Sequence, residues 1–199
     1  EGEIVHLRGP NGAGKSSLLR LCCGLLALRS GEAHVLGHDL SLDRRSLRRQ
    51  VGLLGHSTFL YEELSVEENL RFALAAAGAP KENATGAMER LALVGRLPST
   101  PVEKLSAGQR RRAALAVLVG RQPRLWLLDE PHAGLDVEGR QLVDAIVTEA
   151  RQGGATILLA SHEHAQAEAL ADRTVHIAGG RIVLGLAVGG DEAEVSHAS

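Results

Sequence analysis

The run Gly9-Pro10-Asn11-Gly12-Ala13-Gly14-Lys15-Ser16 fits the pattern G-x-x-x-x-G-K-[ST]. It follows the apolar residues 4–7 and precedes the apolar segment 17–21, which is the strand–loop–helix context of a phosphate-binding P-loop. Its glycines let backbone N–H groups turn toward phosphate oxygens, and the following helix adds unpaired N–H groups. Lys15 can reach the β- and γ-phosphates, and the Ser16 hydroxyl can bind Mg²⁺. In this context we favour a nucleoside triphosphate site, which includes Ser17, over a solvated glycine-rich turn.

Outward from this run, the apolar pattern alternates between strands and helices. Strands are expected at 4–7, 33–36, 51–54, 125–128, 156–160, 175–177 and 181–184, and helices at 17–21, 44–49, 65–77, 81–94, 107–119, 137–152 and 163–171. Near-continuous apolar strands are typical of a parallel sheet that helices cover on both faces. The strand signal disappears between 57 and 114, where Ser65 and Glu68 form a capping box. We therefore predict one α/β domain over 1–199: a P-loop core of 1–56 and 115–186 with a mostly parallel sheet, an all-helical insert at 57–114, and a flexible tail at 187–199.

The composition permits this fold and excludes several classes of function. The 199 residues carry a net charge of −2 and are 44% hydrophobic, so the chain lacks the basic field typical of nucleic-acid binders. No apolar run is long and uncharged enough to span a bilayer. Cys22 and Cys23 are adjacent and are expected to be free core residues. The chain begins inside an expected strand without a starting methionine, so we expect the first strands of the fold to be missing.

Two carboxylates end the expected strand at 125–128. Asp129 and Glu130 would lie at the sheet edge where ligands of α/β proteins bind. Asp129 is placed to hold Mg²⁺ through water, and Glu130 to polarise the attacking water. A solvated pair before the Pro131 turn is the alternative, but the P-loop favours the catalytic interpretation.

The segment Leu105-Ser106-Ala107-Gly108-Gln109 resembles the signature motif of ABC-type ATPases, which usually have glycine where this chain has Ala107. The other motifs of that family follow in order, and the likeness covers essentially the whole chain. Asp129 and Glu130 resemble its Walker B pair, residues 133–136 its D-loop with Asp136 as the aspartate, and Ser161-His162 its switch histidine.

This resemblance implies an ATP- and Mg²⁺-dependent ATPase that works as a head-to-tail dimer. The signature residues Ser106, Ala107, Gly108 and Gln109 open a helix, so they would form a second anion site at its N-terminus. Since they lie in the helical insert, they would complete the ATP site of the partner copy, as a two-fold arrangement allows. Glu130 would be the general base, and His162 would contact the γ-phosphate.

Two features depart from the family's pattern. Gly55-His56 stands where the family usually has a glutamine that senses Mg²⁺ and couples to the membrane partner. An imidazole nitrogen suits Mg²⁺ less well than an amide oxygen, so His56 would act on the metal directly, through water, or only in coupling. The family's adenine-stacking aromatic would lie upstream of Glu1, and we therefore expect weak nucleotide binding and an exposed sheet edge.

The strings Val51–His56 and Phe59–Leu70 are similar to those of ATPase subunits in cytochrome c maturation systems, often described as haem exporters. In that group a Gly-His pair commonly replaces the glutamine. The resemblance implies membrane transporter subunits as partners and a peripheral place on the cytoplasmic face of the inner membrane. We expect no haem site on this chain, and we interpret Arg110–Arg112 as the solvated face of the signature helix.

Three other functions remain open. The nearest is an ABC ATPase of another exporter, for a drug, lipid or antibiotic, because the membrane subunits select the substrate. An ABC protein acting on ribosomes or DNA would typically carry tandem domains, coiled coils or basic extensions. A small-molecule kinase would leave the signature, the D-loop and His162 unexplained.

Overall fold

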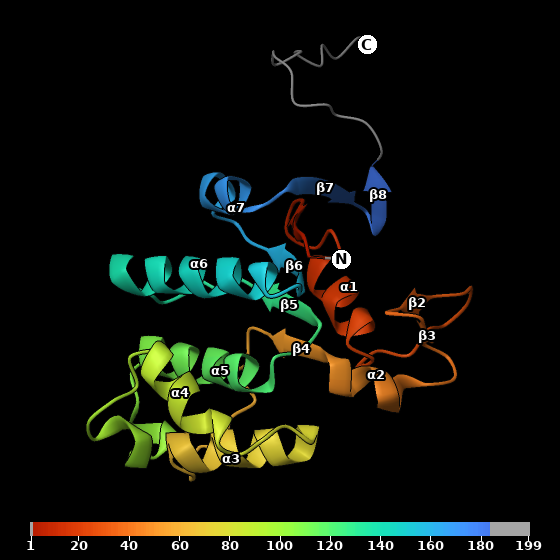
Figure 1. The fold of residues 1–199 in the computed structure, drawn as a ribbon. Coiled ribbons are helices and arrows are strands. Elements are labelled where there is room, and N and C mark those ends of the chain that lie inside the picture. The colour runs from red at the N-terminus through yellow and green to blue at the C-terminus, as the bar shows by residue number, and fades with distance from the viewer. Residues whose placement is uncertain (1, 184–199) are drawn as a thin grey trace, which may run out of the picture.

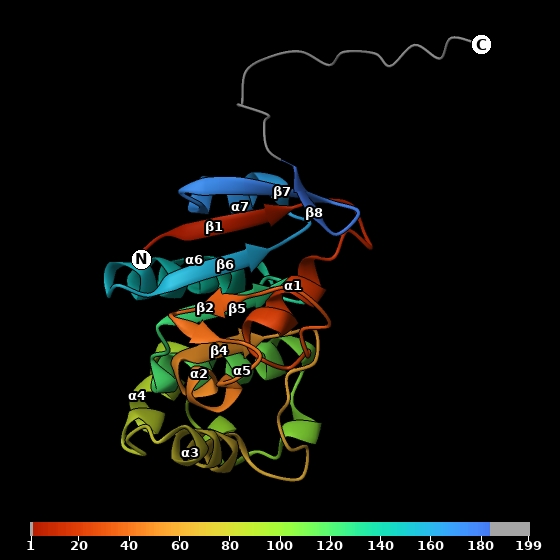
Figure 2. The ribbon, with the colours of Figure 1, turned by 90° about the vertical axis from the view of Figure 1, so that its right-hand side faces the viewer.

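A six-stranded sheet forms the centre of the computed structural model, which describes residues 2–183 (Figure 1). The strand order is β4-β5-β6-β1-β7-β8, and Figure 2 shows the strands side by side. All neighbouring strands are parallel except β7 and β8, which form an antiparallel hairpin. Their bounds are β1 (Ile4–Arg8), β4 (Val51–Leu54), β5 (Leu125–Asp129), β6 (Thr156–Ala160), β7 (Arg173–Ala178) and β8 (Arg181–Val183). The predicted α/β fold with a mostly parallel sheet is confirmed.

Helices cover both faces of the sheet, which explains why β4, β5 and β6 are almost entirely apolar. One face packs against α1 (Lys15–Cys22) and α2 (Arg44–Gln50), and the other against α5 (Ala107–Arg121), α6 (Val137–Gln152) and α7 (His164–Leu170) (Figure 1). Every residue of β5, which lies between β4 and β6, is buried. The two layers form separate apolar clusters, one on each face, as expected for parallel strands that are buried on both sides.

The helical insert lies beyond the edge strand β4. It contains α3 (Val66–Ala77), α4 (Asn83–Arg90), two short 3₁₀ turns (Leu97–Ser99 and Val102–Lys104) and the beginning of α5 (Figure 2). The predicted capping box begins α3, since Ser65 accepts from the Glu68 backbone and Glu68 accepts from the Ser65 N–H. Because α5 continues without interruption past residue 114, the boundaries at 57 and 114 stay a prediction.

Two elements differ from the sequence expectation. The strand expected at 33–36 is reduced to β2 (His34–Val35), which pairs only with β3 (His38–Asp39) in a separate hairpin. Leu36 and Gly37 have φ angles of 50° and 80°, so the chain turns back before a longer strand can form. The helix expected at 81–94 ends at Arg90, because Ala92 has a φ of 53°.

Other expectations concern the cysteines and the chain end. Cys22 and Cys23 are both free, as predicted; Cys23 is buried as expected of a core residue, whereas Cys22 is only half-buried. The final hairpin strand is observed over 181–183, whereas its last expected residue and the predicted tail at 187–199 lie outside the described residues. Among residues 2–183, no helix combines the length and the apolar character needed to cross a bilayer.

Candidate ATP site

Four strand ends meet at one edge of the sheet and bring the predicted site residues together. The carboxyl ends of β1, β4, β5 and β6 lead into the P-loop, His56, Asp129-Glu130 and His162, respectively. Because these strands are parallel, the loops that follow them lie at the same edge. They surround a cavity of about 420 Å³. Its lining residues are Asn11, Gly12, Ala13, Gly14, Lys15, Ser16, Ser17, Arg20, His56, Asp129, Glu130 and His162.

The P-loop has the backbone geometry of a phosphate cradle. Gly12 and Gly14 have φ angles of 78° and 106°, which residues with a β-carbon rarely adopt. No side chain of the described residues caps α1, so its first N–H groups keep their capacity to bind an anion at a helix N-terminus. Lys15 is buried, and its Nζ donates to the carbonyls of Gly9 at 2.6 Å and Pro10 at 3.2 Å. This loop therefore fits a polyphosphate.

Gly9 packs against strand β7 with no room for a side chain. A β-carbon at Gly9 would lie 2.1 Å from the Ile177 carbonyl oxygen. We expect Gly9→Ala to cost about 1–3 kcal/mol in the free energy of unfolding, as overpacked sites do, and to weaken ATP binding because the P-loop must shift. Denaturant unfolding and nucleotide titration measure both effects. Gly86→Ala on α4, where a β-carbon would meet nothing within 4 Å, is the control, and an equal effect of the two changes would contradict the expectation.

Glu130 and His162 are directly in contact across the β5 and β6 ends. Glu130 Oε2 accepts from the His162 backbone N–H at 3.1 Å, and His162 Nε2 lies 3.4 Å from Glu130 Oε1. The Glu130 backbone is left-handed, with a φ of 51°, and its N–H donates to the Ala160 carbonyl at 2.8 Å. The Asp129 side chain points into the same cavity and is largely buried. This arrangement places a carboxylate and an imidazole together beside the phosphate cradle.

The predicted signature residues lie away from this cavity. Ser106 caps α5, since its Oγ accepts from the Gln109 N–H and Gln109 Oε1 accepts from the Ser106 N–H. Gly108 packs against the loop before α6, where a β-carbon on Gly108 would lie 3.3 Å from the Gly134 oxygen. Asp136 caps α6 by accepting from the Gly139 N–H at 2.8 Å. Neither the signature residues nor Asp136 line the cavity, so within one chain they do not meet the P-loop.

The prediction that Arg110–Arg112 form a solvated face is wrong for Arg111. Its side chain is 5% exposed and donates to four backbone carbonyls, those of Gly55, Asp129, Glu130 and Pro131. Position 111 shares the face of α5 that Ala114, Leu115 and Leu118 bury against the core. Helical periodicity was the signal that could have separated Arg111 from its two neighbours.

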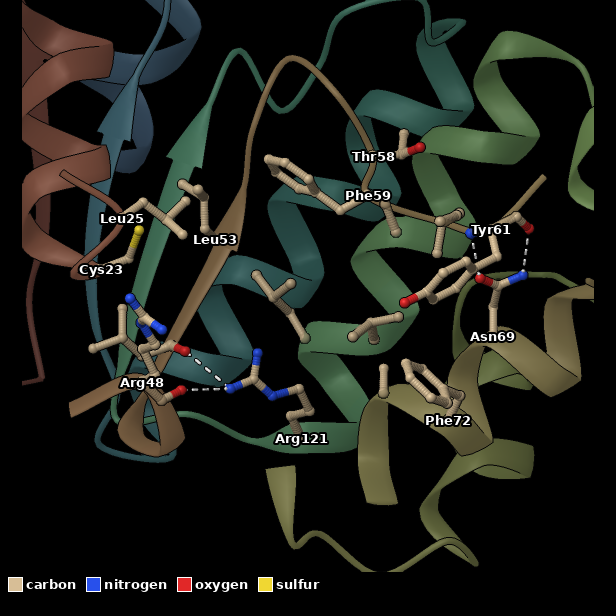
Figure 3. Close-up of a pocket in the computed structure, with 16 residues that line it drawn as sticks. Cys23, Leu25, Arg48, Leu53, Thr58, Phe59, Tyr61, Asn69, Phe72 and Arg121 are labelled. Carbon is tan, nitrogen blue, oxygen red and sulfur yellow. Dashed lines mark hydrogen bonds between the residues drawn. The ribbon is translucent and has the colours of Figure 1, made fainter. Parts of the chain in front are cut away.

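A second hollow, which sequence reasoning missed, lies between α2, α3, α5 and the chain that follows β4 (Figure 3). Its volume is about 360 Å³. Three aromatic side chains at its rim, Phe59, Tyr61 and Phe72, are more than half exposed, and the last two meet edge to face at 5.2 Å. At its other end Arg121 donates to the carbonyls of Arg48 and Val51. We call this hollow the aromatic groove.

Comparison with known proteins identifies the family. Residues 1–133 match the ABC transporter family. The chain is 40% identical over 179 residues to the cytochrome c biogenesis ATP-binding export protein CcmA of Bordetella bronchiseptica. The aligned region covers 88% of this chain and 79% of the relative. It is 44% identical over 164 residues to the protein of the same name from Nitrobacter hamburgensis, covering 81% of this chain and 79% of the relative.

Solved structures agree with this assignment. A structure described as the ATP binding subunit of an ABC transporter aligns with a TM-score of 0.84 and 32% identity, covering 91% of this chain and 77% of that one. The ATP-binding cassette MJ0796, in a dimeric structure bound to ADP and Pi, aligns with a TM-score of 0.85 over 96% of this chain and 88% of that one; at 24% identity it shows the fold alone. The chain therefore belongs to the ABC transporter family, as an ATP-binding, ATP-hydrolysing subunit of CcmA type, and the predicted family and enzyme class are confirmed.

Proposed function

We propose that this chain drives export for cytochrome c biogenesis, as the haem-related resemblance predicts, from the cytoplasmic face of the inner membrane. The cavity that unites the P-loop, Asp129, Glu130 and His162 carries the ATPase part of this proposal. The names of the relatives support the choice of pathway over drug, lipid or antibiotic export.

The donor set of the cavity fits ATP together with Mg²⁺. The Ser16 hydroxyl and the Asp129 carboxylate are oxygen ligands of the kind that Mg²⁺ prefers, and both line the cavity beside Lys15. When bound, Mg²⁺ neutralises charge on the β- and γ-phosphates. His56 lines the same cavity and is exposed, so we assign it a role through water or in coupling rather than as a direct ligand.

The side chains of the cavity suit an ATP hydrolysis in which the protein mainly positions the phosphates and the attacking water. Lys15 would exchange the carbonyls of Gly9 and Pro10 for phosphate oxygens. Glu130 would orient the attacking water and accept its proton, while His162, held by its contact with Glu130, would donate to the γ-phosphate.

Two copies would form both ATP sites together. The signature residues and Asp136 lie outside the cavity of their own chain, and they would complete the site of the partner in a head-to-tail homodimer. The helix N-terminus that begins after Ser106 would then face the partner's phosphates.

The aromatic groove would receive a helix of the membrane transporter subunit. Exposed aromatic side chains next to an apolar hollow are typical of an interface core. A neighbouring hollow shares Arg48 and Arg121 with the groove and adds Arg45 and Arg49, so the docked helix should combine apolar residues with acidic ones at one end. The groove also includes residues that follow His56 in the chain, which connects it to the ATP site.

Substitution of Phe72 tests this docking. Phe72 is 53% exposed and lies at the rim of the groove (Figure 3). We expect Phe72→Asp to weaken association with the membrane subunit by about 2 kcal/mol or more, as loss of an aromatic hot spot does, and to leave ATP hydrolysis by the free subunit unchanged. Val94→Asp, at a residue that is 55% exposed in the helical insert but not in the groove, is the control. Equal binding by both variants would refute the groove as the docking site.

Co-purification from native membranes, with partners identified by mass spectrometry, tests the pathway. Recovery with cytochrome c maturation subunits supports the proposal. Recovery with an unrelated permease would keep the ATPase chemistry and overturn the cytochrome assignment. Recovery with ribosomes or DNA would point to a non-transport ABC protein.

A further inference from the structure

Arg111 connects three parts of the ATPase that are far apart in the sequence. Its side chain leaves α5 two residues after the last signature residue, Gln109, and reaches the ends of β4 and β5. Nη1 donates to the backbone carbonyl oxygen of Gly55 at 2.6 Å. Nη2 donates to the backbone carbonyl oxygens of Asp129 and Glu130, each at 2.6 Å. Nε donates to the Pro131 oxygen at 3.3 Å. All three guanidinium nitrogens therefore bind backbone carbonyls.

Arg111 lies behind the ATP cavity and does not line it. Within residues 2–183 its hydrogen bonds all go to backbone carbonyls, so the side chains of Asp129 and Glu130 stay available to the cavity. Its burial disfavours a charged group and lowers the pKa of the guanidinium, whereas the carboxylates of Asp129 and Glu130 favour the charge. Such a buried cation is tolerated because every nitrogen has partners.

The carbonyls that Arg111 binds belong to a turn of unfavourable backbone geometry. Glu130 has a φ of 51°, and a non-glycine residue keeps this conformation only where its surroundings enforce it. Arg111 donates to three consecutive carbonyls of this turn, at 129, 130 and 131. The same side chain restrains Gly55, the residue before His56.

We propose that Arg111 is a positioning residue for ATP hydrolysis, which holds the Glu130 carboxylate and the His56 loop in register with the signature end of α5. This inference rests on the proposed ATPase function. Any tilt of α5, whether caused by a partner's ATP at Ser106 or by a helix in the aromatic groove, would move the Glu130 turn through these hydrogen bonds. Lysine cannot replace arginine here, since one ammonium nitrogen cannot span Gly55 and residues 129–131 together.

Arg111→Lys tests the proposal, with Arg112→Lys as the matched control. Arg112 belongs to the same helix and binds the carbonyls of Leu91 and Ala92 inside the helical insert. We expect Arg111→Lys to lower kcat about 10- to 100-fold while the KM for ATP and the Kd for a fluorescent ATP analogue stay within about threefold, because displacing a catalytic group by about 1 Å costs this much. The control should keep wild-type kcat. If the lysine variant does not fold, Arg111→Gln, whose amide can still bind the turn, is measured instead. The expected result is the same: kcat falls while the KM for ATP stays nearly unchanged.

A trapping experiment distinguishes positioning from a purely structural role. When combined with Glu130→Gln, Arg111→Lys should still allow ATP-dependent dimerisation, measured by light scattering. Equal losses of kcat, ATP affinity and dimerisation would overturn the proposal, as would wild-type kcat in the lysine variant. The wild-type chain is measured in the same series: no turnover there would refute the ATPase function itself, whereas active wild type with an equally active Arg111→Lys overturns only the role of Arg111.

Discussion

Glu130→Gln is expected to lower kcat for ATP by more than about 100-fold while ATP stays bound and two chains stay associated. The amide has nearly the shape of the carboxylate and its oxygen can still accept from the His162 N–H, so the cavity keeps its geometry. It cannot accept a proton from the attacking water, however. Binding and dimerisation should therefore survive, and only the chemical step should fail.

Single-turnover hydrolysis and gel filtration with ATP measure the two halves of this expectation. Glu89→Gln removes the same charge from an exposed position on α4 and serves as the control. Retained turnover in Glu130→Gln would show that another group is the base. Loss of ATP binding in that variant would instead place Glu130 in substrate binding.

Ser106→Arg should abolish hydrolysis without weakening the binding of ATP to the monomer. Ser106 does not line the cavity of its own chain, so a bulky cation there should damage only the site of the partner. Loss of the cap on α5 also costs about 1 kcal/mol of stability. Ser65→Arg is the matched control, because Ser65 caps α3 with the same reciprocal geometry. It should lose comparable stability and keep ATP turnover.

Mixing two inactive variants tests the trans arrangement directly. A dimer of one Ser106→Arg chain and one Lys15→Ala chain contains one site in which both the P-loop and the signature are intact. We expect turnover to return in the mixture, although each variant alone is inactive. If activity stays absent while mixed dimers form, either two intact sites are required or the signature acts within its own chain. Turnover by the wild-type monomer at high dilution, lost in Ser106→Arg, would establish the latter.

Much of the fold followed from local patterns. The capping box at Ser65 predicted the start of α3, and the signature residues 106–109 predicted the start of α5, because each acts within four residues. The β5 strand was predictable from its apolar run, which ends at the Asp129-Glu130 pair. In contrast, the helix expected at 81–94 stops at Arg90, since packing and the left-handed Ala92 override the helical pattern.

The candidate site likewise has features that the sequence could predict and features that it could not. The P-loop could be predicted because its glycines and lysine act within one short segment, and the structure gives it the expected geometry. That His56 meets Glu130 and His162 in one cavity depends on the sheet order, which the residue pattern did not predict. The aromatic groove was missed because its three rim aromatics resemble ordinary surface residues until α3 and the loop after β4 pack together.

Sequence alone was sufficient for the phosphate chemistry, the helix starts and the family, because each depends on residues that are neighbours along the chain. Only the tertiary structure could reveal the role of Arg111, whose carbonyl partners at Asp129 and Gly55 are 18 and 56 residues away. In the sequence it is one of three consecutive arginines, which suggested a solvated face. Packing of α5 against the ends of β4 and β5 buries that one guanidinium, and a buried guanidinium must satisfy its donors with the carbonyls that the fold brings to it.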